Sequence, residues 1–341
     1  MTNGPQPGNV WTKETMNIFN DCIKRELLRI NRLLDTLQNL HLVTITKEDL
    51  IKWRGSGYHR QIRFGQEGHD LVTTFVTRNE PVLVARLGAV ELSCLRFYLE
   101  KRVAKKTGYS RKIRTTMTNN AGFFPADDAS LDAFAELFLD SLALVDVMGV
   151  WFNQYEDVIC NTRCRDAELV DLDCFEPFRF SNPWSAALAG RKVLVVHPFV
   201  ESIRKQYAEK RRLLFPSPDV LPDFELMTFK SVQSLAGLKV DFTTWFDAYQ
   251  HMCDEIARID FDICLIGAGA YGLPLASFAK KMGKQAIHLG GVTQILFGIK
   301  GKRWEREYAD TTAKLFNEHW VRPLPSETPA LKDRVDKGCY W

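Results

Sequence analysis

Three apolar runs, each followed by a turn and a helical pattern, recur in the central part of the chain. They begin at Pro81, Lys192 and Phe261, and they do not alternate between apolar and polar residues. Short unbroken apolar runs are typical of strands that are buried on both faces of a parallel sheet. The pattern therefore predicts an α/β fold of the doubly wound type, with a mostly parallel sheet and flanking helices. Ligands of such folds bind beyond the carboxyl ends of the strands, where the three turns lie.

Capping signals and helical periodicity predict the elements between these runs. Residues 127–150 begin with Asp and Ser capping candidates and continue as an amphipathic helix, and residues 242–258 predict another helix. Residues 228–232 predict a short strand, and residues 177–190 predict an irregular segment before the second apolar run.

The N-terminal part predicts a helical extension that opens at Met16. Its apolar positions alternate between spacings of four and three, and they are Ile23, Leu27, Ile30, Leu34 and Leu37. So short a seam fits a helix packed on its own domain as well as one that joins two copies into a homo-oligomer.

Changes in composition divide the chain into three parts. Residues 45–70 are polar and rich in glycine, which predicts a connector with one short helix. We therefore expect an N-terminal helical extension and connector at residues 1–70, a main α/β domain at 71–322, and a Pro-rich, charged and loosely ordered C-terminal tail at 323–341.

The composition excludes several classes of function. With 45% hydrophobic residues, 26% charged residues and a formal charge of +3, the chain has no global field typical of nucleic-acid binding. Its eight cysteines follow no disulfide framework, and no ligand-spaced His completes a zinc site with Cys160 and Cys164. No signal peptide or membrane span is expected. We expect a cytoplasmic protein, with contact at the inner membrane surface left open.

The third turn carries the clearest candidate for phosphate binding. Glycines there let the backbone approach a ligand closely, Pro274 suits a first helical turn, and free N–H groups at a helix start favour an anion. The spacing also matches a dinucleotide fingerprint, but the next strand ends in His288, Gly290 and Gly291 without the acidic residue expected for NAD. Glycines that serve only strand–helix packing are the alternative. The candidate residues of the turn are Gly267, Gly269, Tyr271 and Gly272.

Two further segments place charge near these turns. Lys300, Lys302 and Arg303 precede Trp304, and could clamp phosphates or form a solvated basic loop. In the first turn, Arg86 should end the strand and Glu91 should lie in the first turn of the next helix, across Gly88. Glu91 could be a favourable helix start only, or a carboxylate that activates an acceptor beside a phosphate-binding guanidinium.

In order and spacing, these motifs resemble the GT-D class of bacterial glycosyltransferases, in the branch with an R-x-G-x-x-E motif found among surface-polysaccharide and glycoprotein genes. The similarity covers roughly residues 75 to 310. The matching segments are Arg86-x-Gly88-x-x-Glu91, Asn120-Ala-Gly122-Phe-Phe-Pro125, His197-Pro198-Phe199, residues 267–272, His288-Leu-Gly290-Gly291 and residues 297–304.

The resemblance implies a Rossmann-like catalytic domain that moves a sugar from a nucleoside-diphosphate sugar, most often a UDP-sugar, to a saccharide or glycoconjugate acceptor in polysaccharide biosynthesis. Glu91 and Arg86 are then the catalytic candidates. Asn120 and His197 join the binding site through the resemblance, with His197 also a second candidate for the base.

The resemblance also raises a divalent metal, Mn or Mg, as a cofactor. Better-described members carry a D-x-E whose glutamate aligns with Glu91, but Ala89 stands at the position of its first acid. Arg86, Lys300, Lys302 and Arg303 are therefore expected to supply the positive charge in place of a metal. Two other functions stay open, namely an NAD-linked oxidoreductase and a non-catalytic nucleotide-binding module that uses the N-terminal seam.

Overall fold

The computed structural model describes residues 46–104 and 108–341. The predicted helix from Met16, and with it the predicted dimer seam, lies outside these residues. Within them no helix is both long and apolar enough to cross a membrane.

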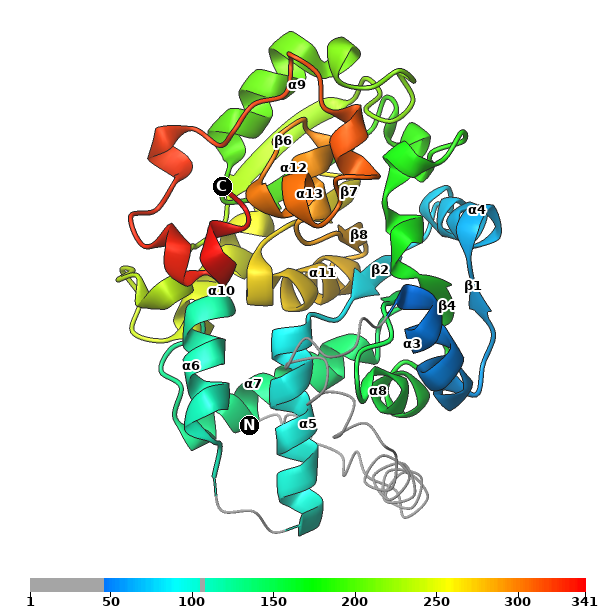
Figure 1. Cartoon of the computed structure of the whole chain (residues 1–341). Coiled ribbons are helices and arrows are strands. Elements are labelled where there is room, and N and C mark those ends of the chain that lie inside the picture. The colour runs from blue at the N-terminus through cyan, green and yellow to red at the C-terminus, as the bar shows by residue number, and fades with distance from the viewer. Residues whose placement is uncertain (1–45, 105–107) are drawn as a thin grey trace, which may run out of the picture.

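One sheet of eight parallel strands runs through the molecule, in the order β1-β4-β3-β2-β8-β7-β5-β6 (Figure 1). This confirms the predicted parallel α/β fold. The three predicted runs form β2, β5 and β7, and the strands expected at residues 228–232 and after the third turn correspond to β6 and β8. The strands are β1 Ile62–Arg63, β2 Leu83–Arg86, β3 Val147–Val150, β4 Glu168–Asp171, β5 Lys192–His197, β6 Glu225–Lys230, β7 Ile263–Ile266 and β8 Gln285–His288.

Helices cover both faces of the sheet because successive strand residues are buried on opposite sides. In β5, Leu194 and Val196 join one apolar core and Val193 and Val195 the other. The first core is covered by α5 Ala89–Ala104, α6 Arg111–Asn120, α7 Asp128–Leu142, α8 Glu156–Thr162, α10 Trp245–Ile256 and α11 Gly272–Lys281. The second is covered by α4 Gly65–Val76, α9 Val200–Leu214, α12 Val292–Leu296 and α13 Lys302–Arg306.

The helix expected over residues 127–150 is shorter than the sequence indicates. It begins at its Asp127 cap and ends at Leu142, and the remaining residues turn and form β3. The pattern hid this strand because its apolar residues continue directly from the apolar face of the helix. The helix expected at 242–258 is confirmed as α10.

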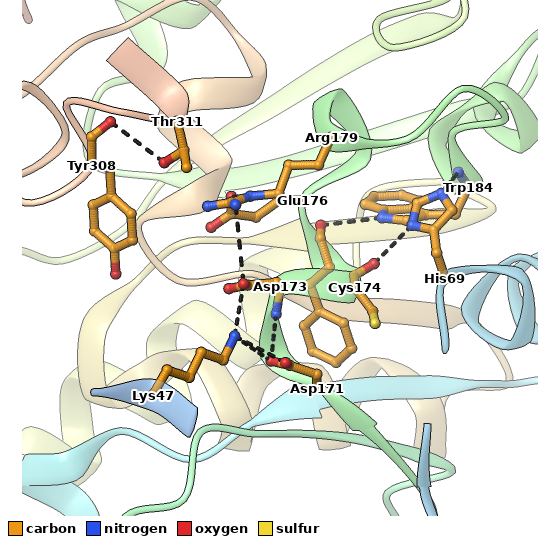
Figure 2. Close-up of polar contacts among 11 residues, drawn as sticks. Lys47, His69, Asp171, Asp173, Cys174, Glu176, Arg179, Trp184, Tyr308 and Thr311 are labelled. Atoms are coloured by element: carbon orange, nitrogen blue, oxygen red, sulfur yellow. Dashed lines mark hydrogen bonds and ion pairs between the residues drawn. The ribbon is translucent and has the colours of Figure 1, made fainter. Parts of the chain in front are cut away.

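The boundary expected near residue 70 falls inside α4, and the preceding residues are bound to the sheet. Strand β1 pairs with β4 at the sheet edge. The first described helix, α3 Lys47–Arg54, contacts the end of β4. The Lys47 ammonium donates to the carboxylates of Asp171 and Asp173 at 2.9 and 2.7 Å (Figure 2). His69 of α4 donates to the Cys174 carbonyl and accepts from the Trp184 N–H. Residues 46–70 therefore belong to the same body as the sheet.

The tail expected to be loosely ordered packs against the domain instead. It passes along α9 and returns beside α12 and α13 (Figure 1), and Trp341 is only 4% exposed. Charged and Pro-rich composition indicated a loose segment, but its aromatic residues reach the second core.

The cysteines of the described residues are all buried, and none of them forms a disulfide bond with another of these residues. Burial raises the pKa of the Cys253 thiol to about 11.

Candidate functional site

A cavity of about 260 Å³ lies at the carboxyl ends of β2, β5, β7 and β8. Most of the predicted site residues line it, although they come from distant parts of the sequence. These residues are Arg86, Gly88, Glu91, Asn120, His197, Gly267, Gly269, His288, Gly290, Gly291 and Arg303.

The cavity lies where the connections of the sheet change direction. Strand β5 continues through α9 to β6 on one side, whereas its neighbour β7 continues through α11 to β8 on the other. The two helices cover opposite faces of the sheet, so a crevice opens between the ends of β5 and β7, where α/β folds bind their ligands. His197 and Gly267 lie at this position, and a Cβ on Gly267 would come 2.6 Å from the His197 ring. Gly267 thus permits the close approach of the two strand ends.

Arg86 ends β2, and its guanidinium lies over an aromatic ring. Its Cζ is 4.2 Å from the centre of the Trp151 ring. Trp151 follows β3 and donates its indole N–H to the Leu87 carbonyl at 2.9 Å, which fixes the ring under Arg86. The Arg86 Nε is buried without a hydrogen-bond partner, and burial lowers the pKa of the guanidinium. A buried cation with an unmatched donor is suited to bind an anionic ligand.

Glu91 lies in the first turn of α5, as the sequence predicts, and its carboxylate folds back over the turn at Gly88. A Cβ on Gly88 would come 2.0 Å from a carboxylate oxygen of Glu91, so glycine leaves the room that this conformation of Glu91 occupies. Burial raises the pKa of Glu91, while its own backbone N–H and Arg86 oppose that shift. The pKa of this carboxyl group therefore lies closer to neutral pH than that of an exposed glutamate, which suits a proton acceptor.

His197 is buried at the end of β5, in one defined tautomer. The backbone N–H of Phe199 donates to its Nδ1 at 3.0 Å, so the ring proton of the neutral imidazole is on Nε2. Burial lowers the pKa of His197 to about 3. The ring thus offers a hydrogen-bond donor at Nε2. Because Nδ1 already accepts the Phe199 N–H, neither nitrogen can act as the base that the sequence suggested.

His288 is fixed in the opposite tautomer at the end of β8. Its Nδ1 lies 3.2 Å from the Arg86 carbonyl, which can only accept, so the ring proton is on Nδ1. Burial, together with the nearby Arg86 charge, lowers the pKa of His288 to about 3. The ring packs on Gly272, where an added Cβ would come 2.3 Å from Nε2. Gly272 therefore serves the packing of His288 and does not line the cavity.

Three other predicted residues also lie off the cavity wall. Tyr271 stacks on Trp245 with ring centres 4.6 Å apart. Lys300 follows α12 and donates its backbone N–H to the Val321 carbonyl, and the Lys302 ammonium lies 3.6 Å from Asp333. Of the predicted basic segment, Arg303 alone lines the cavity within the part of the chain that the structure describes.

Several cavity residues were not predicted from the sequence. They are Trp151, Phe199, Gln233, Gln294, Tyr340 and Trp341. Phe199 is part of the His197-Pro198-Phe199 motif. Trp151 follows β3, where the sequence pattern predicts helix, and Tyr340 and Trp341 lie in the segment that the composition predicts to be loosely ordered. The aromatic pair Tyr340 and Trp341 in a charged, Pro-rich segment was the one signal available.

The cavity does not offer a preformed set of metal ligands. Glu91 is the only Asp or Glu side chain among the described residues that line it. Nor do residues 46–104 and 108–341 contain any group of three or more His, Cys, Asp or Glu placed to hold a metal ion. A single side-chain carboxylate with no further His, Cys, Asp or Glu cluster among the described residues does not fit a divalent cation.

Comparisons with known proteins found two solved structures of low similarity. No family model matches the chain, and no curated protein matches it. A solved structure described as a selenomethionine-substituted domain of unknown function 1792 aligns with a TM-score of 0.43 at 10% identity, over 85% of this chain and 98% of that one. Another, described with the words "the highly conserved domain of unknown function 1792 has a distinct glycosyltransferase fold", aligns with a TM-score of 0.42 at 12% identity over the same shares.

Proposed function

We propose that the protein is a glycosyltransferase that takes its sugar from a nucleoside-diphosphate sugar, with UDP-sugars as the first donors to test. One observation carries the proposal. Arg86 and Glu91, from the turn after β2, line the same cavity as Gly267 and Gly269 from the turn after β7. A cation, a carboxylate and a glycine-rich helix start thus converge at one edge of the sheet, as binding a diphosphate beside a reacting hydroxyl requires.

The diphosphate is expected to bind between the two arginines of the cavity. The pKa of Arg86 is sensitive to the Arg303 charge, so the two guanidinium groups lie within electrostatic reach of each other. The Glu307 carboxylate lies 3.8 Å from the Arg303 Nε, and an anion bound between the two guanidinium groups would further reduce their repulsion. The Nε2–H of His197 and the backbone beside Gly269 add neutral donors. These groups stabilise the negative charge that develops on the leaving diphosphate.

Glu91 is the residue proposed to accept the proton of the acceptor hydroxyl. It lies close enough to Arg86 for the arginine to lower its pKa, so base and diphosphate site are neighbours. In the transfer step the acceptor oxygen bonds to the anomeric carbon, the bond from that carbon to the diphosphate breaks, and Glu91 takes the hydroxyl proton. The acceptor is proposed to be a saccharide or glycoconjugate, and Asn120 at the end of α6 supplies an amide on the same wall.

A donor screen tests this proposal. The purified chain is incubated with UDP-sugars and other nucleoside-diphosphate sugars, and the released nucleotide is measured by mass spectrometry with EDTA or with manganese. We expect release that persists in EDTA, since arginines carry the charge. Calorimetric titration with UDP, UDP-sugars and NAD(H) accompanies the screen. Binding of NAD(H) alone would instead favour the oxidoreductase, and nucleotide binding with no turnover would favour a non-catalytic module.

Variants separate the site from the fold. Glu91→Gln and Arg86→Ala are each expected to lower the transfer rate by about 10²–10³-fold, which is typical for the loss of one well-placed charged group. Glu209→Gln on the exposed face of α9 is the matched control and should keep wild-type activity. Near-normal turnover in both site variants would overturn the proposed roles.

A further inference from the structure

The C-terminal residues of the chain form part of the cavity wall. Val335, Tyr340 and Trp341 line the cavity, although the motifs that suggested a glycosyltransferase end before them. Tyr340 is half-buried and Trp341 is almost fully buried. The site is therefore completed by a segment outside the repeated strand–helix units.

Backbone hydrogen bonds dock this segment against the elbow between α12 and α13. The Arg303 N–H donates to the Cys339 carbonyl at 2.9 Å, and the Gln294 side-chain amide donates to the Tyr340 carbonyl at 3.2 Å. Gly301 makes this approach possible, because an added Cβ there would come 2.7 Å from the Tyr340 oxygen. Since these contacts are to the backbone, they hold the segment in place whatever side chains it carries.

Trp341 adds a second anchor. Its indole N–H donates to the Glu327 carbonyl at 3.1 Å, and its ring meets that of Phe199 edge-on at 6.0 Å between centres. The Glu327 carboxylate in turn accepts the backbone N–H groups of Glu201 and Ser202 at the start of α9. Contacts of Cys339 and Trp341 thus fix the chain on both sides of Tyr340, which restricts where its ring can lie.

The Tyr340 ring lies beside both arginines of the site. It packs on Gly291, where an added Cβ would come 3.1 Å from the ring, while Arg86 packs in the same way on the adjacent Gly290 at 3.2 Å. The Arg303 Cζ lies 5.0 Å from the centre of the Tyr340 ring, and its NH1 donates to the Tyr340 hydroxyl at 3.4 Å. Any group attached to a diphosphate between these arginines therefore comes close to the Tyr340 ring.

We propose that Tyr340 determines specificity for the donor, by providing the wall on which the transferred sugar ring packs. This inference rests on the proposed function. The sugar that is transferred must bridge the diphosphate held by the arginines and the Glu91 carboxylate beside Arg86, because its anomeric carbon reacts there. Tyr340 borders that space, and a fixed aromatic face packs well against the C–H groups of a sugar ring.

Calorimetry with donor and nucleotide tests the assignment. Wild type, Tyr340→Ala and Tyr340→Phe are titrated with UDP, UDP-glucose and UDP-N-acetylglucosamine. Tyr340→Ala is expected to bind the preferred UDP-sugar about 10-fold more weakly, or worse, and to bind UDP within about 2-fold of wild type. Tyr340→Phe keeps the ring and should bind both ligands nearly as wild type does. The ratio of kcat/KM for the two UDP-sugars should also shift in Tyr340→Ala.

Tyr308→Ala serves as the matched control. Tyr308 follows α13 and does not line the cavity, so its loss should leave the affinities unchanged. Thermal denaturation of each variant establishes that it is folded. If Tyr340→Phe is folded and Tyr340→Ala is not, Tyr340→Leu replaces the alanine variant with the same expected result.

The outcomes separate this inference from the proposed function. If wild type binds a UDP-sugar and Tyr340→Ala binds it equally well, the specificity role is wrong and the transferase function stands. An equal loss for UDP and UDP-sugar would also overturn it, because Tyr340 would then contact the nucleotide. If wild type binds neither UDP nor any UDP-sugar of the panel, the proposed function fails, and this inference fails with it.

Discussion

The guanidinium of Arg86 lies over the indole ring of Trp151, with the Arg86 Cζ 4.2 Å from the ring centre. The two residues come from neighbouring strands, since β2 and β3 pair in parallel just before them. Trp151 is itself held by its N–H to the Leu87 carbonyl. The proposed phosphate-binding cation is thus placed by a rigid platform, and a ligand does not have to order a mobile side chain.

This stacking predicts that charge alone does not preserve the site. Arg86→Lys keeps the positive charge but loses the planar group that lies on Trp151 and the fork that can hold a phosphate. We expect kcat/KM for the donor to fall by about 10²-fold or more. The control is Arg102→Lys, because the Arg102 Cζ also lies over a ring, that of Tyr98 at 4.8 Å, but outside the cavity. Equal, small effects in the two variants would contradict a binding role for the Arg86 guanidinium.

The raised pKa of Glu91 predicts an acid limb in the pH–rate profile. A base must be ionised to accept a proton, so kcat/KM should fall as the pH drops through the pKa of Glu91, which burial raises above its usual value of 4.5. In Glu91→Gln this acid limb should disappear, and the remaining rate should be about 10²–10⁴-fold lower. The check is a pH–rate profile of both proteins under saturating acceptor. An unchanged acid limb in the variant would assign it to another group.

We expect that His197 does not titrate near neutral pH. Burial holds its pKa at about 3, and the Phe199 N–H fixes Nδ1 as the unprotonated nitrogen. Nitrogen-15 NMR of labelled histidine should show one signal of the Nε2–H tautomer that stays constant from about pH 5 to about pH 8. His197→Ala should lower the affinity for UDP by about 10-fold through the loss of one donor. A resonance that titrates near pH 6.5 with unchanged UDP affinity would argue against this role.

The elements that the sequence predicted well are those whose signal is local. Strands β5 and β7 are apolar runs bounded by turns, and Gly267 after β7 marks the place where the chain approaches His197. Strand β3 was missed because the apolar face of α7 runs into it without a break in pattern. The two-residue strand β1 carries almost no periodic signal, and only its pairing with β4 defines it.

The site residues divide in the same way. Arg86, Glu91 and Gly267 follow from a strand, a turn and a helix start, which are all visible in sequence. Trp151 and Tyr340 reach the cavity because segments far apart in the chain dock there, and no local pattern encodes that docking. Lys300 and Lys302 are the opposite case. A basic run beside a glycine turn suggested a phosphate clamp, but neither lysine lines the cavity, and the Lys302 ammonium lies 3.6 Å from Asp333.

Glu156 is buried beneath the Trp151 platform and carries a prediction about stability. Its Oε2 accepts the N–H groups of Trp151 and Asn153 at 3.1 Å and the Tyr58 hydroxyl at 2.9 Å, while its Oε1 has no partner. Burial raises the pKa of this carboxyl from 4.5 to about 7. The two residues in left-handed conformation next to it, Phe152 and Tyr155, show that the turn is held in an unfavourable backbone shape.

Because the folded-state pKa is raised, the sign of the pH effect is opposite to that of a salt-bridged acid. Between pH 4.5 and about 7 the unfolded chain releases this proton while the folded protein keeps it, so Glu156 makes the free energy of unfolding fall as the pH rises. At 1.36 kcal/mol per pKa unit the loss amounts to about 3 kcal/mol, complete above the folded-state pKa.

The variant Glu156→Gln has no carboxyl group at this position and does not titrate there. Urea unfolding at about pH 5 and about pH 8 should therefore show the variant gaining up to this amount relative to wild type at the higher pH. The exposed Glu48→Gln should run parallel to wild type at both values. If Glu156→Gln also runs parallel, the carboxyl is ionised in the folded state, and the three hydrogen bonds to Oε2 outweigh the cost of burying its charge.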